Sequence, residues 1–249
     1  MIDHRIASRA EWEAASRELL AEEKAWTDER DRLAAKHMAL PWVKVEKDYA
    51  FDSPEGRVTL ADLFDGRRQL FVYHFMFAPD WEEGCGGCSF IGDHVDGARQ
   101  HFEHNDLSFA AISRAPVEKI EAYRKRMGWT FRWVSSGDSD FNYDFHASFT
   151  PEERENGTAE WNFTQKGDPG TSDIPGASLF YRDEDGSIYH TYSTFARGGE
   201  MLLTTYAFLD MAPLGRNEGD GIMHWMKRHD RYPDDGRTVP LAAEPAEAA

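Results

Sequence analysis

Apolar residues are distributed along the chain in repeats that predict alternating strands and helices. Residues 69–77 are an almost unbroken run of apolar and aromatic side chains, as in a strand whose two faces are both covered by helices. Residues 107–113 predict a second buried strand. Between these strands, apolar residues recur at spacings of four, three and four, as on one face of a helix: Ile91, Val95, Ala98 and Phe102. The pattern therefore predicts a strand, a helix that extends to about residue 104, and a second strand.

Periodicity and turn residues also predict the elements that follow. In chain order they are a helix bracketed by Pro116 and Gly128, a short strand at 131–134, hairpin strands at 177–182 and 188–195, a helix at 198–211 and a short helix near 222–226. The hairpin is closed near Asp185-Gly186. Two strand–helix units followed by an antiparallel hairpin and a helix predict an α/β fold with a mixed sheet flanked by helices.

The N-terminal region predicts one long helix over residues 8–37, starting at a capping box formed by Ser8 and Glu11. Apolar residues recur in it every seven positions, and most residues between them are charged or alanine: Trp12, Leu19, Trp26 and Leu33. So narrow an apolar stripe suits a helix packed on its own domain, or one packed against a partner subunit in a homodimer. Pro41 ends the helix, and a strand is predicted at 43–52.

Regular periodicity is absent from residues 135–175, which are rich in Asp, Ser, Asn and Gly. The stretch still holds many aromatic residues: Phe141, Tyr143, Phe145, Phe149, Trp161 and Phe163. This content predicts an ordered insertion, and we expect it to pack near the cysteine pair described below. The predicted organisation is thus an N-terminal helical extension at 1–40, a domain at 41–232 that contains this insertion, and a disordered tail at 233–249.

Charge and composition exclude several classes of function. The formal net charge of −17 argues against binding to nucleic acids and to anionic membrane surfaces. No apolar run approaches the ~20 residues of a membrane-spanning helix. The chain begins with Met1-Ile2-Asp3-His4-Arg5 and leads into a charged helix without the apolar core of a signal peptide. We therefore expect a cytoplasmic protein, and a lone structural disulfide is rare in that reducing compartment.

The candidate chemistry lies in Cys85-Gly86-Gly87-Cys88, which contains the only two cysteines of the chain. A strand, a short loop, C-x-x-C and an amphipathic helix form the context of thiol–disulfide exchange. Cys85 is expected at the helix N-terminus, where free N–H groups, including those of the two glycines, favour a thiolate. Cys88, one turn further, is expected to be less exposed and to resolve a mixed disulfide.

Residues around the pair predict further properties of the site. Asp80, Glu82 and Glu83 lie just upstream, where carboxylates raise a thiol pKa and repel anionic disulfides. Trp81 is a candidate substrate contact, with a core-capping role as the alternative. Pro175 precedes a hairpin strand, roughly where a thioredoxin-like fold places a cis-proline that faces the disulfide.

Several unusual stretches resemble one family, in that family's order: Leu40-Pro41-Trp42-Val43, Phe77-Ala78-Pro79-Asp80-Trp81, Arg126-Met127-Gly128-Trp129, Phe141-Asn142-Tyr143-Asp144-Phe145 and His190-Thr191-Tyr192-Ser193-Thr194. It is a bacterial family of unknown function that is classed as thioredoxin-like and predicted to contain dithiol–disulfide oxidoreductases. The resemblance covers roughly residues 4–232 and implies a thioredoxin-like fold. For the activity it implies only Cys85 and Cys88. Gly84 and Gly87 stand where thioredoxin has Trp and Pro.

Metal binding is the main alternative to redox chemistry. Cys85, Cys88, His101 and His104 form C-x2-C-x12-H-x2-H, close to the spacing of a zinc finger. The last gap is one residue short, the preceding strand is buried, and the histidines also suit a helix C-terminus. A thioredoxin-like copper site would instead combine the two thiolates with His190 of the hairpin.

The sequence thus predicts a thioredoxin-like dithiol–disulfide oxidoreductase without a cofactor. Cys85 is the expected nucleophile and Cys88 the resolving thiol, with a thiol or disulfide of a protein or small molecule as the substrate. Trp81, Gly86, Gly87 and Pro175 are the candidate substrate contacts. No peroxide-site P-x-x-x-T-x-x-C pattern precedes either cysteine. Assembly through the N-terminal helix is a further hypothesis for the role of the protein.

Overall fold

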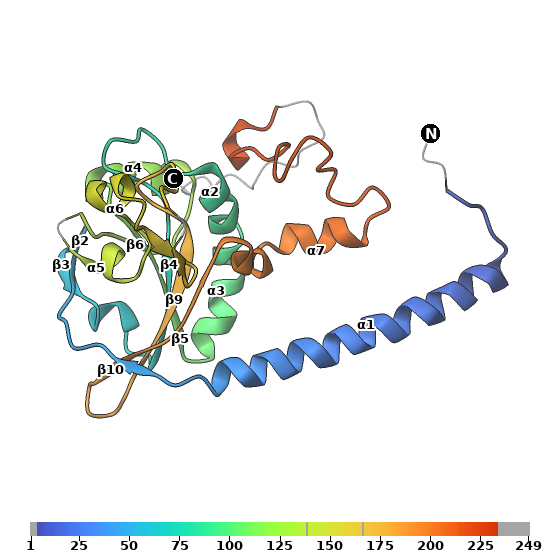
Figure 1. The fold of residues 1–249 in the computed structure, drawn as a ribbon, viewed down its shortest axis with the longest axis horizontal. Coiled ribbons are helices and arrows are strands. Elements are labelled where there is room, and N and C mark those ends of the chain that lie inside the picture. Colours follow the sequence, from blue (N-terminus) through green and yellow to red (C-terminus); the bar gives the residue numbers. More distant parts are fainter. Residues whose placement is uncertain (1–3, 138, 166, 234–249) are drawn as a thin grey trace, which may run out of the picture. The chain divides into compact units, whose positions relative to one another are not determined.

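The computed structural model describes residues 4–137, 139–165 and 167–233 (Figure 1). The chain forms two compact units, residues 1–42 and residues 43–249. The predicted disordered tail at 233–249 lies, from residue 234 onward, outside the described residues. Among the described residues, no helix is both long enough and apolar enough to cross a membrane.

The first unit consists of helix α1, Arg9–Met38. Its first turn is closed by the predicted capping box, in which the Ser8 side chain accepts from the backbone N–H of Glu11 and the Glu11 carboxylate accepts from that of Ser8. Lys36 and His37 in the last turn complement the helix dipole. A single helix cannot cover its own apolar stripe, and no residue of α1 is buried.

The second unit is built on an eight-stranded sheet in the order β1-β10-β9-β4-β5-β6-β2-β3. The strands are β1 Val43–Lys44, β2 Ala50–Ser53, β3 Gly56–Thr59, β4 Gln69–His74, β5 Leu107–Ser113, β6 Arg132–Ser135, β9 Gly176–Arg182 and β10 Ile188–Phe195. Strands β4, β5 and β6 are parallel, whereas β9 runs antiparallel to both β4 and β10. The order β10-β9-β4-β5 is that of the thioredoxin fold, so the predicted mixed sheet and hairpin are confirmed.

The strand predicted at 43–52 is wrong as a single element. Its two ends form β1 and β2, which lie on opposite sides of the sheet, next to β10 and β6. The charged residues Glu46, Lys47 and Asp48 interrupt the apolar alternation between them. Lys47 instead binds the carboxylates of Asp140 and Asp144, at 2.6 and 2.7 Å.

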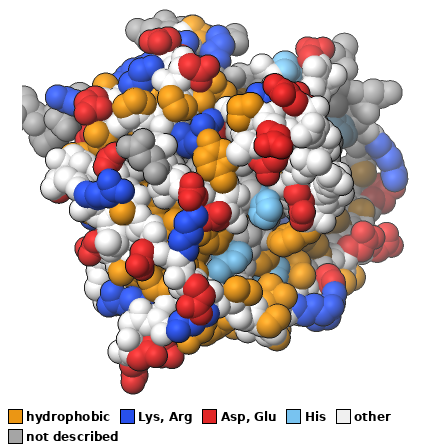
Figure 2. Space-filling view, turned by 60° about the vertical axis from the view of Figure 1, so that its left-hand side comes forward, with side chains coloured by type: hydrophobic (Ala, Val, Ile, Leu, Met, Phe, Trp, Pro, Cys, Tyr) orange, Lys and Arg blue, Asp and Glu red, His pale blue; other side chains and the backbone are white. Residues whose placement is uncertain are grey.

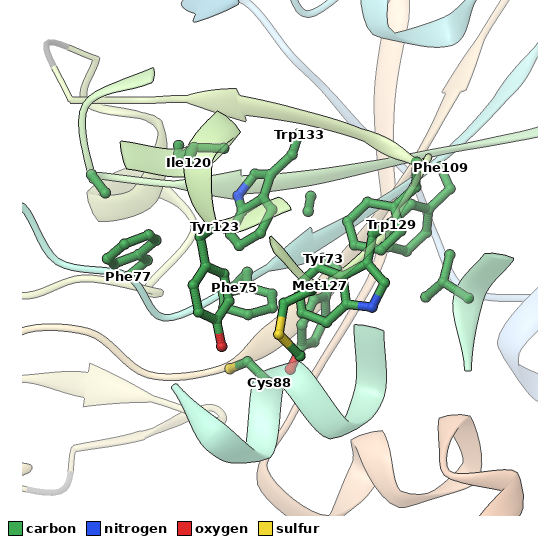
Figure 3. Packing of buried hydrophobic residues seen from close by; sticks show 14 residues of the cluster. Tyr73, Phe75, Phe77, Cys88, Phe109, Ile120, Tyr123, Met127, Trp129 and Trp133 are labelled. Carbon is green, nitrogen blue, oxygen red and sulfur yellow. The ribbon is translucent and has the colours of Figure 1, made fainter. Parts of the chain in front are cut away.

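Strand β4 separates two hydrophobic cores because its side chains alternate between the faces of the sheet. Leu70 and Val72 belong to a core on one face, where the 3-10 helix η1 (Asp62–Phe64) and helix α5 (Phe141–Asp144) pack. Tyr73 on the other face joins an aromatic core with Phe75, Trp129, Trp133 and Cys88 (Figure 3). Helices α3 (Val95–His104) and α4 (Val117–Arg126) contribute to this second core, which therefore supports the cysteines.

The single helix predicted up to about residue 104 is two helices, α2 (Gly86–Gly92) and α3. Tertiary contacts fix the break between them. A Cβ at Gly92 would lie 2.9 Å from the Trp129 ring, and the Asp93 carboxylate accepts a 2.8 Å hydrogen bond from Trp129 Nε1. The His94 ring also hydrogen-bonds the Phe90 carbonyl, at 2.6 Å.

The predicted helix at 198–211 is also divided, into the 3-10 helix η2 (Ala196–Leu202) and helix α7 (Thr204–Met211). Leu203 between them is buried in a cluster with Phe90 and Tyr206. The short helix predicted near 222–226 is wrong, because this segment forms turns. Its apolar side chains pack on the same Phe90 cluster, and the 3-10 helix η3 (His229–Arg231) follows.

The insertion at 135–175 is ordered, with α5, α6 (Pro151–Glu155) and the small ribbon β7–β8 (Glu160–Trp161, Thr164–Gln165). The prediction that it packs near the cysteines is wrong for α5. Phe141 is fully buried against Tyr49, Phe51 and His74, on the face opposite to Cys88. The end of the insertion reaches the cysteine face, where Pro175 lines a small pocket with Tyr73.

Charged groups are interspersed on the surface. On the described part of the face that Figure 2 shows, Lys and Arg side chains lie singly among Asp and Glu, with hydrophobic side chains between them. This face therefore lacks the continuous basic surface that a nucleic acid would require.

Candidate functional site

The cysteine pair lies where the central strand β4 ends. The chain first continues along β5, with hydrogen bonds from Phe75 N to Ile112 O and from Ala115 N to Phe77 O. It then turns back, and Cys85 N donates to Met76 O at 3.0 Å. Cys85 is therefore held beside the carboxyl end of a parallel strand, where α/β folds commonly place their sites.

Cys85 is the N-cap residue of α2. Its carbonyl accepts from the Ser89 N–H at 2.9 Å and from the Ser89 hydroxyl at 2.8 Å, which fixes the start of the helix. Several donors lower the pKa of the Cys85 thiol to about 6: first the Cys88 thiol, then the backbone N–H groups of Cys88 and Gly87, and the charge of Arg228. Burial opposes this shift. The thiolate is thus the main form at neutral pH.

Cys88 has the opposite environment, as predicted for a resolving thiol. Its side chain is 1% exposed, whereas Cys85 is half-buried. Burial, followed by the neighbouring Cys85 sulfur, raises the pKa of Cys88 well above its ordinary value. The Met76 N–H donates to its sulfur at 3.4 Å. The two thiols therefore differ in protonation: the pKa of Cys85 is lowered and that of the buried Cys88 is raised.

The glycines around the pair have different roles. A Cβ at Gly84 would lie 2.7 Å from Phe75 Cε1 and 2.9 Å from Tyr123 Cε1, so no side chain fits where thioredoxin has a tryptophan. Gly86 and Gly87 have more room: their nearest neighbours would be Met226 Cε at 3.7 Å and Met223 Sδ at 3.9 Å. Both glycines are partly exposed.

The remaining candidate substrate contacts are Trp81 and Pro175. Trp81 is partly buried against the aromatic core, and its carbonyl accepts from Lys119 Nζ at 3.1 Å. Its core-capping alternative is therefore present in the structure. Pro175 lines the small pocket together with Tyr73 and Ile91. The described residues contain no cis peptide bond, so the expected cis-proline is wrong.

Of the acidic residues before Cys85, Glu83 is paired with arginines. Glu83 pairs with Arg126 at 2.6 Å, with Arg228 at 3.3 Å and with Arg231. These contacts lower the pKa of Glu83, and the hydrogen bond from Arg126 has the largest effect. Glu82 approaches Lys119 at 3.7 Å and is 92% exposed. The sequence left open whether these carboxylates or the helix N-terminus would dominate the Cys85 pKa. The net shift is downward, first because of the hydrogen bond from the Cys88 thiol, then because of the backbone N–H groups of Cys88 and Gly87, with the charge of Arg228 adding less.

The metal sites considered from the sequence are not assembled. His101 and His104 lie exposed in the last turn of α3. The His190 ring packs against Phe145 and Phe180, on the sheet face opposite to Cys88. Within the described ranges, no group of three or more His, Cys, Asp or Glu side chains could hold a metal ion.

Comparison of the sequence with family models gives one assignment. The model described as "Bacterial protein of unknown function (DUF899)" matches residues 1–232. The chain belongs to this family. The family assignment agrees with the resemblance found in the sequence. No curated protein matches the chain.

Solved structures similar to this member of the family include peroxiredoxins. A cysteine-to-serine variant of PrxQ from Xylella fastidiosa has 16% identity and a TM-score of 0.41, and covers 64% of this chain and 88% of its own. The peroxidoxin BcpB from Mycobacterium tuberculosis has 14% identity and a TM-score of 0.45, over 67% and 95% of the chains. The mitochondrial 2-Cys peroxiredoxin of Plasmodium falciparum has 14% identity and a TM-score of 0.38, over 68% and 91%.

The sequence of this family member did not predict that residues 222–232, which we call the C-terminal cover, contact the site. Its Arg228 donates to the Gly84 carbonyl and, at 2.8 Å, to the Tyr123 hydroxyl. His229 Nδ1 lies 2.7 Å from the Asp93 carboxylate. These contacts join positions more than a hundred residues apart, so no local pattern could reveal them.

Proposed function

We propose that this protein is a dithiol–disulfide oxidoreductase in which Cys85 is the nucleophile and Cys88 the resolving thiol. The observation that carries the proposal is the contrast between two sulfurs one helical turn apart. Cys85 is half-buried with its pKa lowered to about 6, and Cys88 is buried with its pKa raised. A low-pKa accessible thiolate attacks disulfides readily, and a protected second thiol then completes the exchange.

The reaction requires no group beyond the dithiol and the substrate disulfide. The Cys85 thiolate attacks one sulfur of the substrate, a Cys85–substrate disulfide forms, and the first substrate thiolate leaves. Cys88 then loses its proton, which passes to the departing thiolate or to solvent, and attacks Cys85 Sγ. The second substrate thiolate leaves as the Cys85–Cys88 bond forms. The dithiol is oxidised by two electrons, and the substrate disulfide is reduced to two thiols.

Trapping with oxidised glutathione tests this assignment. At neutral pH the reduced Cys88→Ser variant is expected to accumulate a stable glutathione adduct on Cys85, seen by mass spectrometry. The unchanged protein is expected to pass to an internal disulfide and release both glutathiones. Cys85→Ser is the matched control and should not react, because Cys88 is buried and protonated. An adduct on Cys85→Ser at the same rate, or a lack of internal disulfide in the unchanged protein, would overturn the proposal.

A further inference from the structure

The hydroxyl of Tyr73 is a buried polar group without an assigned role. Tyr73 is 2% exposed, and among the described residues its hydroxyl has no partner at strict hydrogen-bond geometry; the group that it approaches closely enough for a weak hydrogen bond is the Cys88 thiol. Burying a hydroxyl without a partner is costly, so such groups in a native structure commonly have a functional reason. Replacement by phenylalanine would have removed this cost without changing the shape of the core.

The surroundings of this hydroxyl point to the cysteine pair. Tyr73 is the β4 residue on the face covered by α2, and its ring packs edge-on against Phe75. In Figure 3 its side chain extends from the sheet toward α2, where Cys88 lies. Besides burial, the sulfurs of Cys88 and then Cys85 raise the pKa of Tyr73 well above its ordinary value. The hydroxyl therefore keeps its proton and is able to donate a hydrogen bond to a cysteine thiolate.

Cys88 needs such a donor during one step. Its sulfur lies in an aromatic core with the Met76 N–H as its backbone donor. When Cys88 loses its proton to resolve a mixed disulfide, a negative charge forms in this apolar environment, which is unfavourable without hydrogen bonds. In the same step Cys85 is disulfide-bonded and carries no charge that Tyr73 could stabilise.

We propose that the Tyr73 hydroxyl donates a hydrogen bond to the Cys88 thiolate and so assists the resolving step. This inference rests on the proposed function. Tyr73 is neutral throughout, and the proton of Cys88 goes to the departing thiolate or to solvent. In the resting dithiol the contact between this hydroxyl and the Cys88 thiol is weak and outside strict hydrogen-bond geometry, and it becomes a charge-assisted bond when the thiolate forms.

Tyr123 offers a matched control. It belongs to the same aromatic core, but its hydroxyl is already paired, with the Ser89 hydroxyl and with Arg228 Nε, both at 2.8 Å. Loss of that hydroxyl should disturb packing and the C-terminal cover without removing a donor to Cys88.

The first measurement does not depend on turnover. In a Cys85→Ser background, the ¹³Cβ chemical shift of isotope-labelled Cys88 is followed against pH, because the tyrosines of the chain ionise and absorb in the same alkaline range as this thiol. Tyr73→Phe is expected to raise the apparent Cys88 pKa by about one pH unit, whereas Tyr123→Phe leaves it unchanged. Tyr73→Leu is a second variant without the hydroxyl in case Tyr73→Phe does not fold. An unchanged pKa in a folded Tyr73 variant, or an equal rise with Tyr123→Phe, would overturn the inference.

The second measurement follows resolution in proteins with both cysteines. After mixing with oxidised glutathione, release of the second glutathione is expected to be about tenfold slower in Tyr73→Phe at neutral pH, with formation of the first adduct unaffected. A slower first step with normal resolution would contradict the assigned step. If no adduct forms even in the unchanged protein, the proposed function fails, and the pH titration of Cys88 still decides the role of Tyr73.

Discussion

At the scale of single residues, two identical side chains have opposite properties because of their position in one helical turn. Cys85 is the N-cap and receives hydrogen bonds from Gly87 and Cys88, whereas Cys88 lies inside the aromatic core. The shift of each pKa follows from solvation and donors, as it does for cysteines in general.

The lowered pKa predicts the pH profile of alkylation. With iodoacetamide, the rate at Cys85 should rise through a midpoint near pH 6, the pKa of its thiol. Cys88 should stay unmodified over this range in the folded protein, because burial raises its pKa. Peptide mapping after short labelling at each pH measures both rates. A midpoint near the ordinary thiol value of about 8.5, or faster labelling of Cys88, would contradict the assignment.

The same shift predicts how stability depends on pH. The folded pKa of Cys85, about 6, lies below the unfolded value of about 8.5. Its thiolate therefore contributes stability that is fully present above about pH 8.5 and is lost as the pH falls through 6. Cys85→Ser should destabilise the reduced protein more at high pH than at pH 5, as measured by urea unfolding. An equal effect at both pH values would show that the shift is absent.

The sequence assigned repulsion of anionic disulfides to Asp80, Glu82 and Glu83 together, whereas the structure predicts a separate effect of Glu83 through its arginines. Glu83→Gln removes the shared partner of Arg126, Arg228 and Arg231, so more positive charge acts on Cys85. Reaction with oxidised glutathione at low salt should become about threefold faster, and the gain should shrink as salt is added. Glu82→Gln is the control and should change little, because Glu82 is 92% exposed. Equal gains would instead support a simple repulsion by the acidic loop.

At the scale of elements, the packing of Gly84, which precedes the N-cap residue Cys85, fixes where α2 begins. Gly84 lies against Phe75 and Tyr123, and its carbonyl accepts from Arg228, so the loop, α4 and the C-terminal cover meet at one position. The N-terminus of α2 is thereby held in place on three sides, and Cys85 with it.

The close packing around Gly84 predicts how much a single added methyl group destabilises the protein. Gly84→Ala should lower the free energy of unfolding by about 1–3 kcal/mol, since the Cβ would overlap two buried aromatic rings. Gly86→Ala is the matched control two residues away, where the nearest atom, Met226 Cε, lies 3.7 Å from the added carbon. Its effect should stay within about 0.5 kcal/mol. Urea unfolding of the reduced proteins measures both changes, and equal effects would contradict the packing argument.

At the scale of the whole molecule, the N-terminal helix is a separate unit with an apolar stripe that it cannot cover alone. The stripe of Trp12, Leu19, Trp26 and Leu33 recurs every seven residues. Such a repeat over 30 residues is typical of a helix that packs on another surface. Homodimerisation through this stripe remains a prediction.

Substitutions on two faces of α1 test whether the protein forms a homodimer through the apolar stripe. Light scattering after size-exclusion chromatography is expected to give the mass of a dimer for the unchanged protein and of a monomer for Leu19→Glu combined with Trp26→Glu. Ala14→Glu combined with Ala21→Glu adds the same charge on the opposite helix face and should leave the dimer intact. A monomeric unchanged protein would contradict homodimerisation. A dimer that persists in the Leu19→Glu, Trp26→Glu variant would show that another surface forms it.

The sequence by itself determined the elements whose signals are local. The capping box of Ser8 and Glu11, the buried run of β4, the Asp185-Gly186 hairpin and the position of Cys85 before a helix all depend on residues within a few positions of one another. Such signals act through backbone propensity, turn geometry and the alternation of apolar residues. They were sufficient for the thioredoxin-like order of elements and for the candidate dithiol.

Only the tertiary structure decided the features that depend on distant partners. The break after Gly92 requires Trp129, and the neutralised charge at Glu83 requires Arg126 and arginines from the C-terminal cover. The donor that Tyr73 offers depends on the direction in which β4 presents its side chains to α2. Each of these results from packing or charge pairing across long sequence separations, and no pattern along the chain records which distant side chains will meet.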